Sequence, residues 1–493
     1  MPIKSWRECM KYDLIITGAH VLDPANGIDG VTSIGIKDGK FSEISEFLDP
    51  TESEHVIDAT GKYLSPGWFD MHVHVYSNLA FSDPDTIGVL HGVTTMVDAG
   101  GAGVWTYQDY RDYWEGQSKT EVYSFLSDQP VGILLGTRED LANRAHTNKD
   151  VPMQHFHDIV SVNREHILAI KSGVHTYNGF DRVKDAWKIC EAVGLPKYLH
   201  IGDIRKPPGI RFTREAMDML STGDCFTHVY TGNWGNILDD EGKVLQEVRS
   251  AIKRGVATDV GYGGLNFSFK AFDTLIEQGI ITDVISSDLQ GVNITGPCHS
   301  LAHVMSIFLN HGFTMNEIIE RVTIRPAKLL GLNHKIGSIS PGMPARVTAF
   351  DIQTGDYIFR DTKGESRRGE SMIVPRWVLM DGEYIESDEA PGLQQKNWSF
   401  MPRSNNQDNE NDLTPQQIEF VRHLASAVTK ANWDDGLSIQ TFYKQALKDC
   451  EILNRDAANA IYDLLLESRF SVPPGWLMSA MERDVVLHQL QNV

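Results

Sequence analysis

The feature that most constrains the fold is a long stretch, residues 63–335, in which short apolar runs alternate with helical stretches. This alternation predicts repeated strand–helix units and a parallel sheet. The stretch has close to the roughly 250 residues typical of a (β/α)8 TIM barrel, so we expect that fold. The clearest strand candidates are short and end near a polar residue: 94–97, 167–170, 198–201, 226–229, 257–260 and 284–287.

Shorter β-rich runs flank this stretch on both sides. Residues 13–62 contain apolar runs broken by turn residues, which predict small antiparallel strands. Residues 336–388 have the same texture, with Asp381-Gly382 as a hairpin signal. We therefore expect the two flanks to pair into one small discontinuous β-sandwich beside the barrel.

The composition changes again towards the C-terminus. Residues 389–413 are rich in Asn, Gln, Ser and acidic residues, which predicts a linker. Thr414, Pro415 and Gln417 then form a helix-start pattern, with an N-cap, a proline in the first turn and a capping box. We expect a helical C-terminal extension over residues 414–493, which contains no catalytic motif and serves packing or oligomer contacts.

Charge and apolar content exclude several classes of partner. The net charge of -21, with no basic block to offset it, disfavours nucleic acid and anionic membrane surfaces. No apolar stretch is long enough to span a bilayer, and residues 1–12 lack the apolar segment of a signal peptide. The five cysteines form no paired framework, which suggests reduced thiols. These features predict a cytoplasmic protein with a small-molecule substrate, and they leave a homo-oligomer open.

The strongest motif is Asp70-Met71-His72-Val73-His74, at the end of an apolar run. Residues two apart in a strand share a face, so His72 and His74 can bind one metal ion, and Asp70 can orient a histidine. The spacing alone is weak evidence. His155 and His157 have it too, but no strand-like run precedes them, and we expect both at the surface.

The other candidate residues strengthen this motif. Lys171, His200, His228 and Asp288 each lie at or near the end of a predicted parallel strand. Barrel enzymes place their active sites at that end of the strands. Taken singly, each residue has an ordinary alternative: a lysine at the core edge, a hydrogen-bonded histidine, or a helix-capping aspartate. Together they favour a metal site.

In chain order, this set resembles the binuclear metal hydrolases of the amidohydrolase superfamily. The similarity is closest to the branch of dihydroorotase-like deacetylases and N-acyl amino acid hydrolases. Residues 67–72, 91–100 and 322–327 have the texture of that branch, and the resemblance extends over about residues 13–385.

The resemblance implies a ligand set of His72, His74, Lys171, His200, His228 and Asp288 for two divalent metal ions, expected to be Zn2+. His72, His74 and Asp288 would hold the more buried ion. Lys171 would bridge both ions as a carbamate formed with CO2, which needs a lysine whose pKa burial has lowered. A metal-bridging hydroxide would attack the carbonyl, with Asp288 as the general acid and base.

The loops after these ligands are expected to contact substrate. The candidates are Arg205, Tyr230, Asn233 and Tyr262. A basic residue such as Arg205 suits a substrate carboxylate. The sequence also departs from the branch, which has histidine where Tyr262 and Gln290 stand and asparagine where Thr231 stands. None of these three is a metal ligand, so the departures concern the choice of substrate.

These features favour an amidase or deacetylase that hydrolyses an amide or acyl ester of a small molecule. A cyclic-amide hydrolase, acting on a hydantoin-like or dihydroorotate-like ring, shares the same metal centre and differs in its loops. An esterase or lactonase is a further alternative. A non-catalytic scaffold related to dihydropyrimidinases is disfavoured, because all six ligand positions are intact.

Overall fold

The computed structural model describes residues 10–75, 82–114, 118–130, 132–133, 151–174, 179–203, 209–290, 293–294, 296–387, 413–433, 436–452 and 454–465, and, near the C-terminus, 474, 478, 481, 483–491 and 493.

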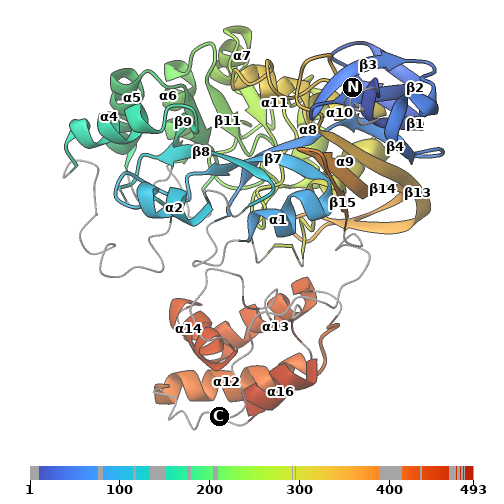
Figure 1. Ribbon diagram of the computed structural model, residues 1–493. Coiled ribbons are helices and arrows are strands. Elements are labelled where there is room, and N and C mark those ends of the chain that lie inside the picture. Colours follow the sequence, from blue (N-terminus) through green and yellow to red (C-terminus); the bar gives the residue numbers. More distant parts are fainter. Residues whose placement is uncertain are drawn as a thin grey trace, which may run out of the picture.

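A curled parallel sheet of seven strands forms the centre of the larger part (Figure 1). Neighbouring strands follow one another in chain order, as expected for repeated strand–helix units. The strands are β6 (Trp68–Val73), β7 (Val93–Ala99), β8 (Glu121–Ser127), β9 (Ile167–Gly173), β10 (Lys197–His200), β11 (Cys225–Thr227) and β12 (Ala257–Asp259). Five of the six predicted strand runs therefore coincide with strands of this sheet.

The sixth run, residues 284–287, joins the two edges of the sheet without forming a regular strand. Val284 bridges Asp259 at the end of β12, and Leu289 bridges Val73 at the end of β6. Two backbone bonds support the second contact: Asp288 N donates to His72 O at 2.7 Å, and His74 N donates to Leu289 O at 2.8 Å. The predicted TIM-barrel fold is thus present, with an irregular segment in the eighth position.

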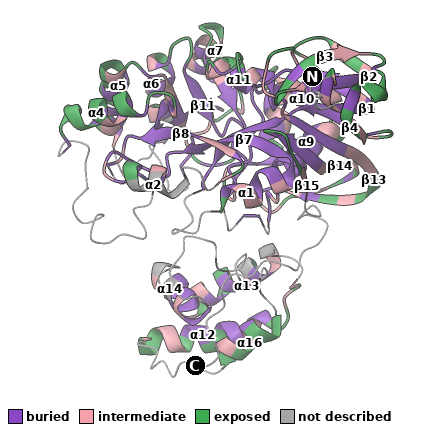
Figure 2. Ribbon diagram, in the orientation of Figure 1, coloured by how far each residue is buried: buried purple, intermediate pink, exposed green. Residues whose placement is uncertain are grey.

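Helices cover the outside of this sheet. They are α1 (Pro84–Ile87), α2 (Tyr107–Trp114), α4 (Met153–Val162), α5 (Phe180–Val193), α6 (Gly209–Met219), α7 (Gln246–Lys253), α8 (Phe269–Glu277), α9 (Leu301–Asn310), α10 (Met315–Arg321) and α11 (Ile324–Leu329). The apolar faces of most of these helices and the outer faces of the strands form one large core, and the opposite faces of α4, α5 and α7 are exposed (Figure 2). α9 is buried from Leu301 to Phe308, and Ala327 of α11 packs in a smaller cluster. His155 and His157 lie on the exposed face of α4, as predicted.

The flanks form a second, mixed sheet that contains β1 (Tyr12–Asp23), β2 (Ile28–Lys37), β3 (Lys40–Ser45), β4 (Ser53–Asp58), β5 (Tyr63–Pro66), β13 (Val347–Arg360), β14 (Ser366–Met380) and β15 (Glu383–Glu386). The early blue strands and the late gold-to-brown strands lie side by side (Figure 1). The pairing of the two flanks was predicted correctly.

The predicted β-sandwich needs correction in three details, and the strand β5 is involved in each of them. β5 pairs with β1 on one side and with β13 on the other, so all eight strands join one hydrogen-bonded sheet instead of the two sheets of a sandwich. β1 runs parallel to β4 and β5, so the N-terminal strands are not all antiparallel. Because β5 belongs to this sheet, the barrel begins at β6 and not at Tyr63.

Two predicted local signals are confirmed. Asp381 and Gly382 have positive φ angles of 51° and 82° and connect β14 to β15, as a hairpin turn of this type requires. Thr414 and Gln417 form a complete capping box at the start of α12 (Pro415–Val428). The predicted linker, residues 389–413, lies outside the described residues except for Leu413.

The C-terminal extension is helical, as predicted. It contains α12, α13 (Gly436–Asp449), α14 (Asn454–Leu465) and α16 (Arg483–Gln491), which form one group in Figure 1. Phe420, Leu424, Tyr443 and Ile461 belong to a hydrophobic cluster that draws only on this extension. Cys190, Cys225, Cys298 and Cys450 are free thiols. Within the described residues, no helix has both the length and the apolar content to cross a membrane.

Candidate metal centre

The two motif histidines lie at the end of β6. His72 is 1% exposed and His74 is 4% exposed, and their ring centroids are 5.5 Å apart. The register of β6 against β7 shifts between Asp70 and Val73. This irregularity explains why Met71 packs in the cluster inside the barrel while Val73 packs in the outer core, although a regular strand would put both on one face.

Asp288 approaches both histidines from the eighth segment. Its Oδ1 lies 3.5 Å from His72 Nε2 and 3.1 Å from His74 Nε2. His72, His228 and Asp288 form a buried group whose donor atoms lie within 4.8 Å of one another. Asp288 Oδ1 is buried and has no hydrogen bond of acceptable geometry to any described residue. A buried carboxylate oxygen facing imidazole nitrogens is the arrangement that a divalent cation stabilises.

Electrostatics keep these groups in the forms that bind metal. Burial alone would raise the pKa of Asp288, but its contact with His74 and the positive charge of Lys171 hold it below its usual value, so the carboxylate is ionised. Burial lowers the pKa of His228 to about 3 and that of His72 well below its usual value. Both imidazole rings are therefore neutral, as metal ligation requires.

His200 and His228 form the second half of the cluster. His228 Nε2 lies 2.8 Å from His200 Nδ1. The other nitrogen of His228, Nδ1, lies 2.6 Å from the carbonyl oxygen of Gly261. Because a carbonyl can only accept, Nδ1 carries the proton and Nε2 presents its lone pair towards His200.

Lys171 ends the apolar run of β9 and reaches into the cluster. Its side chain is 6% exposed, and its Nζ lies 3.3 Å from His72 Nε2 and 4.7 Å from the ring centre of Tyr198. Burial lowers the pKa of Lys171 to about 8. A substantial part of this amine is therefore neutral near physiological pH, which is the form that reacts with CO2.

A hydroxyl network fixes the tautomer of His72. Tyr198 Oη and Thr227 Oγ1 each donate to Asp259 Oδ2 at 2.6 Å. The same two hydroxyls lie 3.0 Å and 3.1 Å from His72 Nδ1. Each hydroxyl has one proton, already given to Asp259, so each can only accept from His72. His72 therefore carries its proton on Nδ1 and leaves Nε2 free to bind metal.

Asp259 was not singled out from the sequence, although this residue has the same signal as the other candidates, a polar side chain at the end of a strand. Asp259 ends β12, as Lys171 and His200 lie at the ends of their strands. Asp70 has a different role from the predicted one. It accepts hydrogen bonds from Ser287 N and Oγ and from His72 N, so it joins β6 to the eighth segment and does not orient a histidine ring.

Backbone strain coincides with the cluster. His228 and Asp288 have positive φ angles of 69° and 52°. Positive φ is uncommon for residues other than glycine and costs about 1–3 kcal/mol. Strain of this kind persists where the surrounding structure holds it, and such positions concentrate at active sites.

The residues predicted to contact substrate have different surroundings in the structure. Tyr230 is fully buried, and its hydroxyl donates to Ile280 O and accepts from Thr282 N. The hydroxyl of Tyr262 donates to Arg360 O. The hydroxyl of Tyr230 thus joins two parts of the barrel, and that of Tyr262 joins the barrel to the end of β13 in the mixed sheet. Within the described residues, neither hydroxyl forms a hydrogen bond to a candidate metal ligand. Asn233 instead belongs to a polar network that reaches the cluster, because it donates to Asn266, which in turn contacts Asp288. Arg205 lies outside the described residues.

Comparison with known proteins identifies the family of the chain. The model of the Amidohydrolase family matches residues 203–403. A protein named Deacetylase from Brucella anthropi is 31% identical over 365 residues, which cover 72% of this chain and 88% of the relative. The chain belongs to the amidohydrolase family. It is a hydrolase that acts on carbon–nitrogen bonds.

Two solved structures agree with this assignment. The crystal structure of an adenine deaminase matches with a TM-score of 0.68 and 28% identity, over 76% of this amidohydrolase and 100% of that chain. The crystal structure of a dihydroorotase matches with a TM-score of 0.67 and 28% identity, over 76% and 98%. The family resemblance predicted from the sequence is therefore confirmed.

Proposed function

We propose that this amidohydrolase is a metal-dependent deacetylase or amidase that hydrolyses the acyl–nitrogen bond of a small molecule. The buried group of His72, His228 and Asp288 carries the metal-dependent part of the proposal. The choice of deacetylase is supported by relatives of that name, which match over 71–77% of the chain.

Each residue of the cluster has a role in this proposal. His72, His74, Asp288 and Lys171, the last as a carbamate, would hold one divalent ion, and His200, His228 and Lys171 a second. Bound divalent ions of this kind acidify water and polarise carbonyl oxygens. Asp288 accepts a proton from the attacking water and passes it to the departing nitrogen. Asp259 and Gly261 hold the two imidazole tautomers that expose Nε2.

A cyclic-amide hydrolase is the second candidate. The structural similarity to a dihydroorotase, at 28% identity over most of both chains, favours it. A ring-opening enzyme needs the same ligands and the same proton transfer by Asp288. The two candidates differ in the substrate. The scissile acyl–nitrogen bond belongs to an open chain in the first case and to a closed ring in the second.

The proposal is tested with purified protein loaded with zinc in the presence of bicarbonate. Hydrolysis is measured on N-acetyl amino acids, acetyl esters and cyclic imides, alongside metal content per chain. We expect about two metal ions and turnover of the N-acetyl compounds, and the Asp288→Asn variant should lose turnover while remaining folded. Turnover confined to cyclic imides would establish the second candidate. Absence of both metal and turnover would refute the enzymatic proposal.

A further inference from the structure

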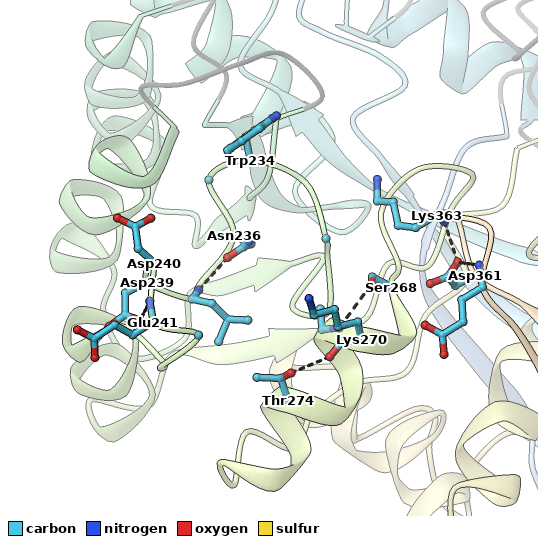
Figure 3. A pocket seen from close by; sticks show the side chains of 16 residues that line it. Trp234, Asn236, Asp239, Asp240, Glu241, Ser268, Lys270, Thr274, Asp361 and Lys363 are labelled. Carbon is cyan, nitrogen blue, oxygen red and sulfur yellow. Dashed lines mark hydrogen bonds between the residues drawn. The ribbon is translucent and has the colours of Figure 1, made fainter. Parts of the chain in front are cut away.

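A cleft of about 830 Å3 lies next to the loop that follows the ligand His228 (Figure 3). One wall is the loop of residues 232–242, another is the start of α8, and the third is the turn of residues 361–365 between β13 and β14. The third wall belongs to the mixed sheet. The cleft therefore brings a residue of the second sheet, Lys363, close to the loops of the barrel.

Lys363 reaches across this boundary in a defined way. Its Nζ donates hydrogen bonds to Asn233 Oδ1 and, at 3.1 Å, to Leu265 O. The side chain passes over Gly232, where a β-carbon would lie 3.4 Å from Lys363 Cε and 2.9 Å from Ser268 Cβ. A side chain at position 232 would crowd this path, so the glycine leaves room for the lysine to reach Asn233.

From Asn233, a chain of hydrogen bonds continues to the metal centre. Asn233 Nδ2 donates to Asn266 Oδ1 at 3.1 Å. Asn266 Nδ2 in turn lies 3.4 Å from Asp288 Oδ2, the outer limit for a hydrogen bond. Three successive contacts thus connect the ammonium of Lys363 to the carboxylate that we assign to proton transfer. An anion bound at Lys363 would lie on the same side of the barrel as the scissile bond.

Both of the hydrogen-bond acceptors that Lys363 Nζ contacts, the amide oxygen of Asn233 and the carbonyl oxygen of Leu265, are neutral. The nearby carboxylate of Asp361 accepts instead from the backbone N–H groups of Phe269, Lys363 and Glu365. Desolvation lowers the pKa of Lys363, the negative charge of Asp361 opposes this shift, and the positive charge of Lys444 in the C-terminal extension adds to it.

The loop beside this ammonium is firmly placed and presents an aromatic surface. The backbone of Trp234 exchanges two hydrogen bonds with Asp203, which lies three residues after the ligand His200. The side chain of Trp234 nevertheless leaves the residue 54% exposed, and the ring projects at the edge of the cleft in Figure 3. Concave sites with aromatic side chains and a few placed polar groups are typical of small-molecule binding. The cleft offers Trp234 and Lys363, and its walls also carry the carboxylates of Asp239, Asp240, Glu241 and Glu365.

We propose that Lys363 binds the carboxylate of the substrate, at the end away from the scissile acyl–nitrogen bond. The inference rests on the proposed function and narrows it to acyl compounds that carry a carboxylate. An anionic group would complete the coordination of the ammonium by a charge-assisted hydrogen bond. Lys363 is thus a specificity-determining residue supplied by the mixed sheet.

The test compares N-acetyl amino acids, each as the free acid and as the carboxamide, with wild-type protein and the Lys363→Met variant. We expect the wild type to prefer the acid, and the ratio of kcat/KM for acid over amide to fall about tenfold or more in the variant, as for the loss of one charge-assisted bond. Lys270 lines the same cleft from α8. The Lys270→Met variant is therefore the matched control and should keep the wild-type ratio of kcat/KM for acid over amide.

The outcomes separate the two proposals. A variant that loses acid and amide hydrolysis equally would show that Lys363 only supports the loop, and an unchanged ratio would also overturn the assignment. If the wild type hydrolyses neither form, the proposed function fails by itself. The subsite is then judged by binding: the acid, but not the amide, should raise the Tm of the wild type and not that of Lys363→Met, and equal effects would refute it.

Discussion

Gly263 passes so close to Asp288 that a β-carbon at position 263 would lie 2.2 Å from Asp288 Oδ2. Gly263 also has a positive φ of 59°. The next residue, Gly264, meets only an ordinary contact, with Asn293 Cβ at 3.7 Å. Of these two adjacent glycines, only Gly263 closely approaches Asp288, the residue that we propose for proton transfer.

Gly263→Ala should displace the Asp288 carboxylate and lower kcat by about 10- to 100-fold, since misplacement of a catalytic group by 1 Å can cost on the order of 100-fold. Its Tm should fall as well, because the clash and the positive φ both strain the folded state. Gly264→Ala is the control and should retain wild-type kcat. Equal activity of the two variants would contradict the close approach.

Tyr198→Phe should weaken metal binding without unfolding the barrel. The variant removes one of the two hydroxyls that hold the Nδ1 proton of His72, and loss of such a partner typically costs about 10- to 100-fold in metal affinity. Competition with a chelator measures the change. Tyr123→Phe is the control, because this buried hydroxyl bonds to Glu121 and Lys335 near the start of its strand. Similar affinity losses in both variants would argue against a specific role for Tyr198.

Uptake of CO2 by Lys171 should depend on pH with a midpoint near 8. The pKa of Lys171 is lowered to about 8, so its neutral form is abundant above that pH and falls about tenfold for each unit below it. At pH 7 about one amine in ten is reactive, compared with about one in three thousand at the ordinary pKa of 10.5. The initial rate of incorporation of labelled CO2 at a fixed dissolved concentration measures this, because the rate follows the neutral amine, whereas the final yield also depends on the proton that carbamate formation releases.

Lys171→Arg should incorporate no label at any pH, since its guanidinium stays protonated. An initial labelling rate of the wild type that continues to rise to about pH 10 would show that the pKa of Lys171 is not lowered.

The C-terminal extension should be separable from catalysis. Among the described residues, the buried members of its hydrophobic cluster all belong to the extension, and the barrel core contains none of them. A chain that ends at Ser387 should therefore keep the kcat/KM of the full-length protein and remain monodisperse. Loss of activity with intact circular dichroism would indicate that the extension contributes to the active site.

Sequence patterns could single out the polar residues at strand ends because that signal is local. A polar residue after an apolar run identified Lys171, His200, His228 and Asp288, and the structure brings all four into one cluster. Tyr262 is one of the positions at which the sequence departs from the deacetylase branch. Its hydroxyl bonds to Arg360 O, which is 98 positions away in the sequence. No local pattern can reveal such a contact.

The same limit applies to the rest of the site. Asp259 Oδ2 lies 3.6 Å from His72 Nδ1 and is linked to it through Tyr198 and Thr227, which come from two other strands. Lys363 comes from the turn between two strands of a different sheet. The sequence identified the two flanks as β-rich, but it could not reveal that β5 would join them edge to edge. That choice depends on the pairing of strands separated by the entire barrel.

The position of β5 has a consequence for synthesis on the ribosome. β5 pairs with β13 through contacts such as Ser65 with Thr348, so its second edge has no partner until the barrel has been translated. At about 5–20 residues per second, this delay lasts on the order of tens of seconds. During that time β5 is an open strand edge, which can pair with another nascent chain. The chain therefore depends on the early folding of the barrel to bring β13 to β5 first.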